Sequence, residues 1–528
     1  MKKIILLSLI FFTLVADSCK KALNVTPTSV VNETNTWNTI EDARAAIMGV
    51  YGLTRAALAD DNGHWIYGDV RMGNFVSPTR QDLKAVVNNN LNAAYPVLNE
   101  LSNWRRFYAI VNAANIFLER IHEIKDKDLR YTANNMTVDV AQVRFLRAFA
   151  YFYMVRIWGD VPFITSSREG TFENQPRSGQ SAILEFVQSE MVTAAADLPY
   201  EYSANDIQQP GLYYNRQRTD WSGVLVKKLG AYAMLAHVAA WQGKYTDVIR
   251  YTQKVLNEYN TLDDLSLTST NTLTSPSGFF YTKSPGGGND NQLFGFGFIW
   301  GDQEAAFTGN MESLALAAPV DNKNIPDIYV PKDSILSIFK EVSDNRFNID
   351  TTGITHSDAV NAVSIKGFFS NFLGKYPIFA KIRCIMGGVN DPSFRLFSSA
   401  IVLTRLEDVY LLRAEAYAVL GEDNLAISDL NVVRQERYTV DDHGRESGGI
   451  VYAYDPNTSG PLIDAIFRER QKEFMGEGDH WYDRIRMEKI KQSNPQFLQL
   501  ISSGGIYWPI SRDILAQNPL LTQNSYWK

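Results

Sequence analysis

Residues 141–162 read AQVRFLRAFAYFYMVRIWGDVP, and this stretch indicates the fold class most clearly. Apolar and small side chains recur within it every three or four residues, which is the spacing of one face of an α-helix. They are Leu146, Phe149, Ala150, Tyr153, Met154 and Ile157. Gly159 and Pro162 follow, and both residue types commonly end helices. The stretch therefore predicts a long amphipathic helix over residues 138–157.

Helical patterns of the same kind fill most of the chain. They cover residues 41–58, 104–124, 181–197, 221–259 (interrupted at Gly243), 406–437 and 462–477. Thr39 precedes the first of them and is of a type that caps helix N-termini. The chain is therefore expected to be mainly all-α.

Two of these helical stretches repeat one another. When Gly243 is set on Gly421, aromatic, small and apolar residues coincide on both sides of the glycine. The pairs are Tyr232 and Tyr410, Ala236 and Ala414, Ala240 and Ala418, Ile249 and Ile427, and Val255 and Val433. Each copy is a helix, a glycine turn and a second helix, which is the tetratricopeptide pattern. If the likeness is not chance, the two copies should pack together.

Long irregular regions separate the helices. Residues 262–317 and 351–394 lack helical spacing, and the first is rich in Ser, Thr and Gly. Loops of this length inside an ordered domain are uncommon and often functional. We therefore expect one tetratricopeptide-like domain over residues 39–528, with long loops and a small irregular subdomain that carries strands.

The first residues are typical of an exported protein. Two lysines precede an apolar run over residues 4–15. This run is shorter than the roughly 20 residues that a membrane-spanning helix needs, but it fits the core of a signal peptide. We predict a signal peptide over residues 1–18.

Small residues stand just before Cys19, as in a bacterial lipobox, although Asp17 departs from the strict pattern. We predict that Cys19 is lipidated and that residues 19–38 tether the domain to a membrane. The alternative is ordinary signal cleavage, with Cys19 uninvolved. If Cys19 is lipidated, Cys384 has no cysteine partner and is expected to pack as a small apolar residue.

Composition excludes several classes of protein. The 528 residues carry a formal charge of −7, whereas a general nucleic-acid binder needs clustered Lys and Arg. A hydrophobic content of 45% excludes wholesale disorder, and two cysteines exclude a disulfide scaffold. The 10 Trp, 26 Tyr and 28 Phe indicate a large core or faces offered to flat ligands.

Four fragments, taken in order, resemble the SusD/RagB family of outer-membrane nutrient-binding lipoproteins of Bacteroidota. The first is LNVTP (residues 23–27), which follows Cys19. The second is AQVRFLRAF (141–149) with RIWGDVP (156–162). The third is Arg470 with EFMGEG (473–478) and WYDRIR (481–486), and the fourth is WPI (508–510) with QNP (517–519). Each fragment is short, but together they extend nearly from end to end.

The resemblance implies a tetratricopeptide-like scaffold with an N-terminal part over about residues 39–240 and a C-terminal part over about 241–528. It implies capture of glycan fragments at the outer membrane, facing the cell exterior, without catalysis, cofactor or metal. The ligand would pass to a SusC-like TonB-dependent β-barrel for import. Capture of peptides or another nutrient stays open, as does a tetratricopeptide scaffold that binds proteins.

The sequence carries no pattern typical of an enzyme. Its six histidines are scattered, and the metalloprotease, nucleophile-elbow, P-loop and dinucleotide patterns are absent. Glu473, Glu477 and Asp479 would form a carboxylate set for glycoside hydrolysis. An ion network in the scaffold is the simpler interpretation, because Arg470 on an apolar helix face needs an acidic partner. Glu473 or Glu477 is the expected partner.

Two segments combine aromatic and polar residues as a sugar-binding site would. Sugar rings stack their C–H faces on aromatic plates, and their hydroxyl edges hydrogen-bond to Asp, Asn and Arg. The segments are residues 64–74 and 296–302, both interpreted as loops. The candidate contacts are Trp65, Asp69, Arg71, Asn74, Tyr281, Asn289, Trp300 and Asp302. The alternative is that Trp65 and Trp300 pin these loops onto the scaffold.

Overall fold

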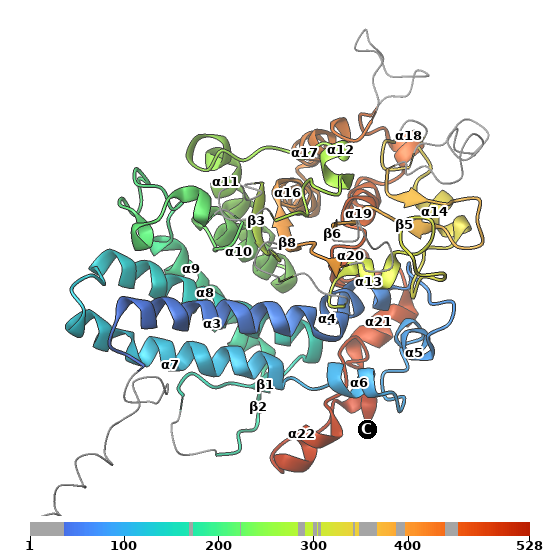
Figure 1. Cartoon of the computed structure of the whole chain (residues 1–528). Helices are drawn as coiled ribbons and strands as arrows, with labels where there is room; N and C mark the ends of the chain where they lie inside the picture. The colour runs from blue at the N-terminus through green and yellow to red at the C-terminus, as the bar shows by residue number, and fades with distance from the viewer. Residues whose placement is uncertain are drawn as a thin grey trace, which may run out of the picture.

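The chain is mainly helical, as predicted (Figure 1). A computed structural model describes residues 36–167, 173–221, 223–282, 291–298, 304, 308–341, 344–347, 367–386, 396–438 and 452–528. The predicted signal peptide, Cys19 and most of the tether lie outside the described residues. Among the helices described, none is both long and apolar enough to cross a membrane.

The long helices form a series in which each packs against the next. The first four are α3 (Ile40–Ala59), α7 (Arg105–Lys127), α8 (Ala133–Trp158) and α9 (Gln180–Asp197). The next four are α10 (Lys228–Gln242), α11 (Tyr245–Leu262), α16 (Leu406–Val419) and α17 (Asp423–Gln435). In Figure 1, α3, α7 and α8 lie below α11, α16 and α17. This succession confirms the tetratricopeptide-like scaffold.

Local sequence signals explain where several of these helices begin and end. Thr39 caps α3, since its side chain accepts a hydrogen bond from the backbone of Asp42, whose carboxylate bonds back to Thr39. Gly243 ends α10 with a φ of 73°, and Gly421 separates α16 from α17 with a φ of 81°. Glycine adopts this left-handed backbone without strain. Because α11 packs on α16, the two repeat copies lie together as predicted.

Two predicted helix boundaries are wrong. The helix expected from residue 221 begins only at Lys228. The helix expected over residues 462–477 ends at Glu473, as α19 (Leu462–Glu473). Gly476 and Gly478 follow with φ values of 81° and 91°, which a helix cannot continue through.

Shorter elements complete the fold. The helices are η1 (Asp60–Asn62), α4 (Gly63–Trp65), η2 (Ile66–Val70), α5 (Gln81–Val87), α6 (Pro96–Leu101), η3 (Tyr213–Asn215), η4 (Arg218–Asp220), α12 (Thr270–Thr274), α13 (Met311–Ala315), α14 (Lys332–Ile338), α18 (Pro456–Ser459), α20 (His480–Lys491), α21 (Pro495–Ser502), α22 (Arg512–Gln517) and η7 (Ser525–Trp527). Antiparallel pairs join β1 (Val161–Pro162) to β2 (Arg177–Ser178), β3 (Gln292–Phe296) to β8 (Ile401–Arg405), β4 (Phe369–Ser370) to β5 (Ile378–Phe379), and β6 (Ile385–Met386) to β7 (Leu396–Phe397). Short strands thus occur in the irregular regions, as expected.

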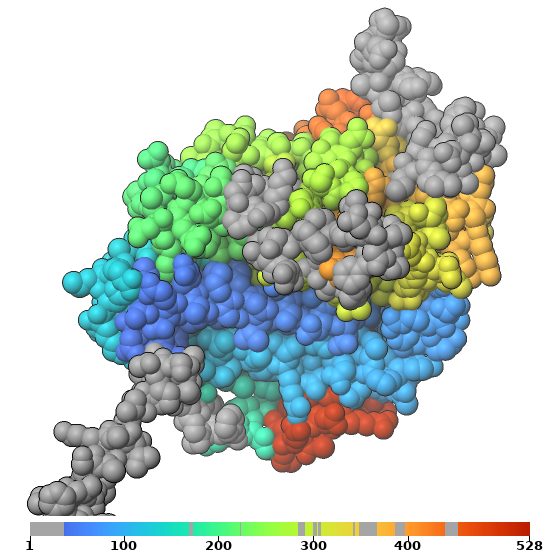
Figure 2. Space-filling view, in the orientation of Figure 1, coloured from blue at the N-terminus to red at the C-terminus, as the bar shows by residue number. Residues whose placement is uncertain are grey.

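The C-terminal segment returns to the N-terminal helices. The backbone N–H of Trp508 donates to the carbonyl of Ile157 at 2.7 Å, and that of Ser511 donates to Ser102 at 3.1 Å. In Figure 2 the C-terminal residues, in red, lie directly below the blue N-terminal band. The C-terminal segment therefore packs against the end of α8 and the residue after α6.

A buried network of ion pairs joins the elements of the C-terminal half. Glu473, at the end of α19, is fully buried. Its carboxylate lies within ion-pair distance of three guanidinium groups, those of Arg346 (3.0 Å), Arg405 (2.8 Å) and Arg437 (2.7 Å). Burial by itself raises the pKa of Glu473, but these guanidinium groups hold it well below its usual range. The carboxylate therefore stays charged and links α19 to β8 and to the end of α17.

Glu477 extends this network into the turn that follows α19. It pairs with Arg405 at 2.9 Å and with the buried ammonium group of Lys381. Lys381 also donates to the carbonyl oxygens of Glu473 (2.7 Å) and Met475 (3.0 Å). The expected ion network of the scaffold is thus present, and it fixes the turn backbone as well as the side chains.

The predicted partner of Arg470 is wrong. Its guanidinium group pairs with Asp408 of α16 and Asp483 of α20, each at 2.9 Å, and not with Glu473 or Glu477. Those two glutamates are held by cations from other elements. Asp408 and Asp483 face α19 from neighbouring helices, a placement that the spacing within α19 cannot reveal.

Substitution Glu473→Gln should lower the free energy of unfolding by about 3–5 kcal/mol, because it leaves three buried guanidinium groups without their shared counter-charge. Urea denaturation followed by circular dichroism measures the change. Glu436→Gln is the matched control, since Glu436 is exposed just beyond α17 and should change stability by less than about 0.5 kcal/mol. Equal stabilities for the two variants would contradict the role given to the network.

Candidate functional site

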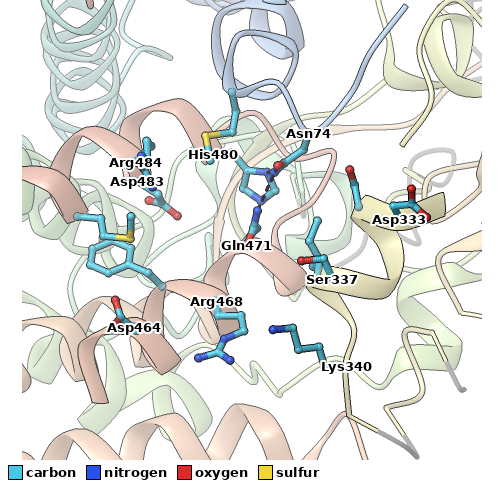
Figure 3. Close-up of a pocket in the computed structure, with 15 residues that line it drawn as sticks. Asn74, Asp333, Ser337, Lys340, Asp464, Arg468, Gln471, His480, Asp483 and Arg484 are labelled. Atoms are coloured by element: carbon cyan, nitrogen blue, oxygen red, sulfur yellow. Dashed lines mark hydrogen bonds between the residues drawn. The ribbon is translucent and has the colours of Figure 1, made fainter. Parts of the chain in front are cut away.

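An open pocket lies between α14, α19 and α20. Its volume is about 550 Å³, which is in the usual range for ligand sites. Figure 3 shows polar side chains from these helices and from the segment after η2 gathered around it. It is the candidate functional site, and we call it the α14–α19–α20 pocket.

Helical spacing places the lining residues of each wall on one face. In α19 they are Asp464, Phe467, Arg468 and Gln471, at positions i, i+3, i+4 and i+7. In α20 they are His480, Asp483, Arg484 and Met487, with the same spacing. The segment of α14 contributes Asp333, Ser334, Ser337, Ile338 and Lys340, and Met72 and Asn74 complete the lining. The pocket therefore combines amide, hydroxyl and charged groups with a few apolar surfaces.

A chain of polar contacts runs along one side of the pocket (Figure 3). Gln471 Nε2 donates to Asn74 Oδ1 at 3.2 Å. Asn74 Nδ2 lies 3.5 Å from His480 Nδ1. His480 Nδ1 also lies 3.2 Å from Asp69 Oδ1. These contacts hold the Asn74 and His480 side chains in fixed orientations.

Asp69 contacts the His480 ring and is itself held by the turn after α19. Its carboxyl group accepts hydrogen bonds from the backbone N–H groups of Gly478 (2.6 Å) and Gly476 (3.4 Å). Burial raises the pKa of Asp69 to about 8, although those backbone donors oppose the rise. Burial also lowers the pKa of His480 to about 4. Both pKa shifts favour the uncharged forms of Asp69 and His480, so this side of the pocket is neutral near pH 7.

The first predicted binding segment is not a loop, and most of its candidate residues are internal. Residues 63–70 form α4 and η2. Trp65 is 2% exposed, and its Nε1 donates to the carbonyl of Gly476 at 3.0 Å. Arg71 stacks on the Trp481 ring at 4.6 Å and is also buried. Trp65 and Asp69 contact the turn after α19, and Arg71 donates to the carbonyl of Gly505 at 2.9 Å, so all three side chains face protein partners.

The remaining predicted contacts are divided. Asn74 lines the α14–α19–α20 pocket. Tyr281 is half-buried beside Ser399, with which it forms a β-bridge, and is not among the lining residues. Three candidates, Asn289, Trp300 and Asp302, lie outside the described residues.

Most of the pocket residues were missed by reasoning from the sequence. The apolar spacing of residues 462–477 predicts which helix face packs against the core, whereas Arg468 and Gln471 lie on the face that lines the pocket. No spacing in the sequence distinguishes His480 from the other five histidines. A polar stripe on α19 facing one on α20 becomes a signal only once the two helices are known to pack together.

The described residues hold no group of three or more His, Cys, Asp or Glu side chains placed to bind a metal ion. Two of the pocket carboxylates are already paired, Asp464 with Lys491 and Asp483 with Arg470 and Arg486. The chemistry that the pocket offers is therefore hydrogen bonding and ion pairing with a bound molecule.

Two family models match separate parts of the chain. The model described as "SusD family" covers residues 391–527, and one described as "Starch-binding associating with outer membrane" covers residues 64–210. The crystal structure of a SusD superfamily protein from Bacteroides thetaiotaomicron is 43% identical with a TM-score of 0.80. That match covers 93% of this chain and 99% of the other. The chain belongs to the SusD/RagB family.

Two further proteins are similar to this chain at lower identity. A SusD-like protein of Formosa agariphila is 25% identical over 550 residues, which is 99% of each chain. NanU of Bacteroides fragilis shares the fold, with a TM-score of 0.65, 19% identity, and coverage of 96% of this chain and 100% of that one. The two SusD-type models include α19, α20 and Asn74, so residues of both matched parts meet in the pocket. The family resemblance drawn from four short fragments is confirmed.

Substitution Gly68→Ala should lower the free energy of unfolding by about 1–3 kcal/mol or more, because overpacking displaces backbone here. A Cβ atom on Gly68 would lie 1.7 Å from the carbonyl oxygen of Gly478, in the turn that supports the pocket. Thermal unfolding measures the loss. Gly52→Ala, in α3, is the control, because no heavy atom lies within 4 Å and the change should stabilise the helix by about 0.5–1 kcal/mol. Equal unfolding temperatures for the two variants would show that the close approach of Gly68 to Gly478 does not require glycine.

Proposed function

We propose that the protein is a non-catalytic receptor that captures oligosaccharide fragments at the outer membrane and passes them to a SusC-like TonB-dependent β-barrel. Membership of the SusD/RagB family supports a nutrient-binding role of this kind. The similarity of residues 64–210 to a model for outer-membrane starch-binding proteins supports a carbohydrate as the nutrient. The observation that carries the proposal is the α14–α19–α20 pocket, since both matched parts of the chain build it.

The groups in this pocket suit a hydroxyl-rich ligand. The amides of Asn74 and Gln471 can each donate and accept, as can the hydroxyl of Ser337. Phe467 is buried and lines the pocket together with Ile338 and Met487. Such surfaces can contact the C–H groups of a sugar ring while the amides bind its hydroxyls.

Absence of catalysis is part of the proposal. Glycoside hydrolysis needs two carboxyl groups free to exchange a proton and to attack or activate water. Asp464 and Asp483 are held in ion pairs, and Glu473 and Glu477 are buried in the scaffold network. These pairings favour binding without turnover.

Isothermal titration against a panel of oligosaccharides and peptides tests the ligand class. We expect binding of at least one oligosaccharide family, with no product released on prolonged incubation. Gln471→Ala should weaken that binding by about tenfold, which is the loss expected for one or two hydrogen bonds of about 1 kcal/mol each. Gln435→Ala, an exposed position at the end of α17, is the matched control and should leave affinity unchanged.

Other outcomes of the titration point elsewhere. Binding of peptides alone would replace the carbohydrate with another nutrient. Release of product would contradict a non-catalytic receptor. Failure to bind any solute, together with tight association with the β-barrel, would favour a protein-binding scaffold.

The lipid anchor at Cys19 is the second part of the proposal. Cys19→Ala should move the protein out of the membrane fraction, because the acyl chains contribute most of the membrane affinity. Cys384→Ala is the control, since Cys384 is a buried free thiol whose pKa is raised by burial, and its loss should not alter location. Protease treatment of whole cells should digest the wild type if it faces the exterior. Full protection would place the protein on the periplasmic side.

A further inference from the structure

Two cationic side chains of the α14–α19–α20 pocket have no carboxylate partner among the described residues. The guanidinium group of Arg468 donates through Nη2 to the carbonyl of Ser459 at 2.6 Å, and no acidic group lies within 4.0 Å among the described residues. Lys340, just after α14, is exposed and likewise has no ion pair within the described part of the chain. In Figure 3 the end of the Lys340 side chain points toward Arg468, and both residues line the same pocket. An anion between them would meet both charges.

The carboxylates of the pocket do not neutralise these two cations. Asp464 stands one helical turn before Arg468 but pairs with Lys491 of α20. Asp483 pairs with Arg470 and Arg486, at 2.9 and 2.8 Å, below the pocket wall.

The other charges of the lining also leave Arg468 and Lys340 unmatched. Arg484 is matched by Glu488 at 2.8 Å. Asp333 is exposed to water, and Figure 3 places it away from Arg468 on the far side of the opening. Within the part of the chain that the structure describes, the positive charges of Arg468 and Lys340 are therefore uncompensated.

A third residue of the lining, His480, carries a polar atom whose hydrogen-bonding capacity is unused within the described part of the chain. His480 is 2% exposed, and its Nε2 has no hydrogen-bond partner among the described residues. Its Nδ1 is engaged by Asp69 and Asn74, so ring rotation cannot satisfy Nε2 without losing those contacts. A buried polar atom left without a hydrogen bond is destabilising, and a ligand hydroxyl that reached Nε2 would satisfy it.

We propose that the α14–α19–α20 pocket takes an acidic sugar unit, and this inference rests on the function proposed above. The carboxylate or sulfate group of the sugar binds between Arg468 and Lys340. Its hydroxyl edge binds along Asn74, Gln471 and His480 Nε2. A guanidinium group is well suited to the acidic group because it presents paired N–H donors to two oxygens at once.

The test compares probes that differ only in charge. Oligogalacturonides and alginate oligosaccharides are each titrated as the free acid and as the methyl ester, and sulfated oligosaccharides are titrated beside their desulfated forms. We expect one acidic probe to bind at least about tenfold more tightly than its neutral counterpart, as one charge-assisted contact predicts. The difference should shrink between 50 and 500 mM NaCl, because salt screens partly exposed charges.

Substitutions of Arg468 and Lys340 test whether these two residues cause the preference for acidic sugars. Lys340→Gln removes an exposed charge with little risk to the fold, and Arg468→Gln removes the other. Each should lower affinity for the acid about tenfold and leave affinity for the ester unchanged. Arg468→Lys should keep part of the preference, and Lys254→Gln, exposed on α11, is the control that should keep all of it.

Three results would overturn the inference. Neutral probes binding as tightly as acidic ones would refute it while leaving the proposed function intact. A preference for acids that survives in Lys340→Gln and Arg468→Gln would place the anion elsewhere on the protein. Binding of no carbohydrate at all would refute the proposed function, and the acidic-sugar inference with it.

Discussion

The buried ion pairs of the turn after α19 are the constraint on which the rest of the structure depends. Glu473 and Glu477 are surrounded there by cations from β8, from the end of α17 and from the irregular region. The other side of the same turn binds Trp65 and Asp69 of the N-terminal half. A buried carboxylate is tolerated only while it is paired, so the turn cannot shift without losing several charge contacts at once. This rigidity fixes where α19 ends and α20 begins.

The pocket follows from that fixed geometry. Its two long walls are the facing surfaces of α19 and α20, and the turn holds them at one angle. The buried charges around this turn are closely paired, as the contacts of Arg470 with Asp408 and Asp483 show. Arg468 and Lys340, in contrast, have no ion pair among the described residues, although both line the pocket.

The sequence-based predictions succeeded where a feature depends on residues close together in the chain, and failed where it depends on residues far apart. Helices such as α8 were predictable because apolar spacing within one segment indicates a helix. The ends at Gly243 and Gly421 were also predictable, because glycine itself adopts the left-handed backbone that ends a helix. The segment over residues 64–74 was misjudged because aromatic and polar residues look alike whether they face a sugar or a neighbouring turn. Trp65 faces a turn, and of its candidate neighbours only Asn74 reaches the pocket.

The sequence by itself determined the helical class, the repeated hairpins and the family, because these depend on spacing within a few turns and on short ordered motifs. Only the tertiary structure decided which charges pair and where a ligand can enter. Asp69 and Gly478 are in contact although 409 residues separate them. The partner of Arg470 likewise depends on how α16 and α20 pack against α19. Such pairings are set by the packing of whole helices, which local residue spacing does not encode.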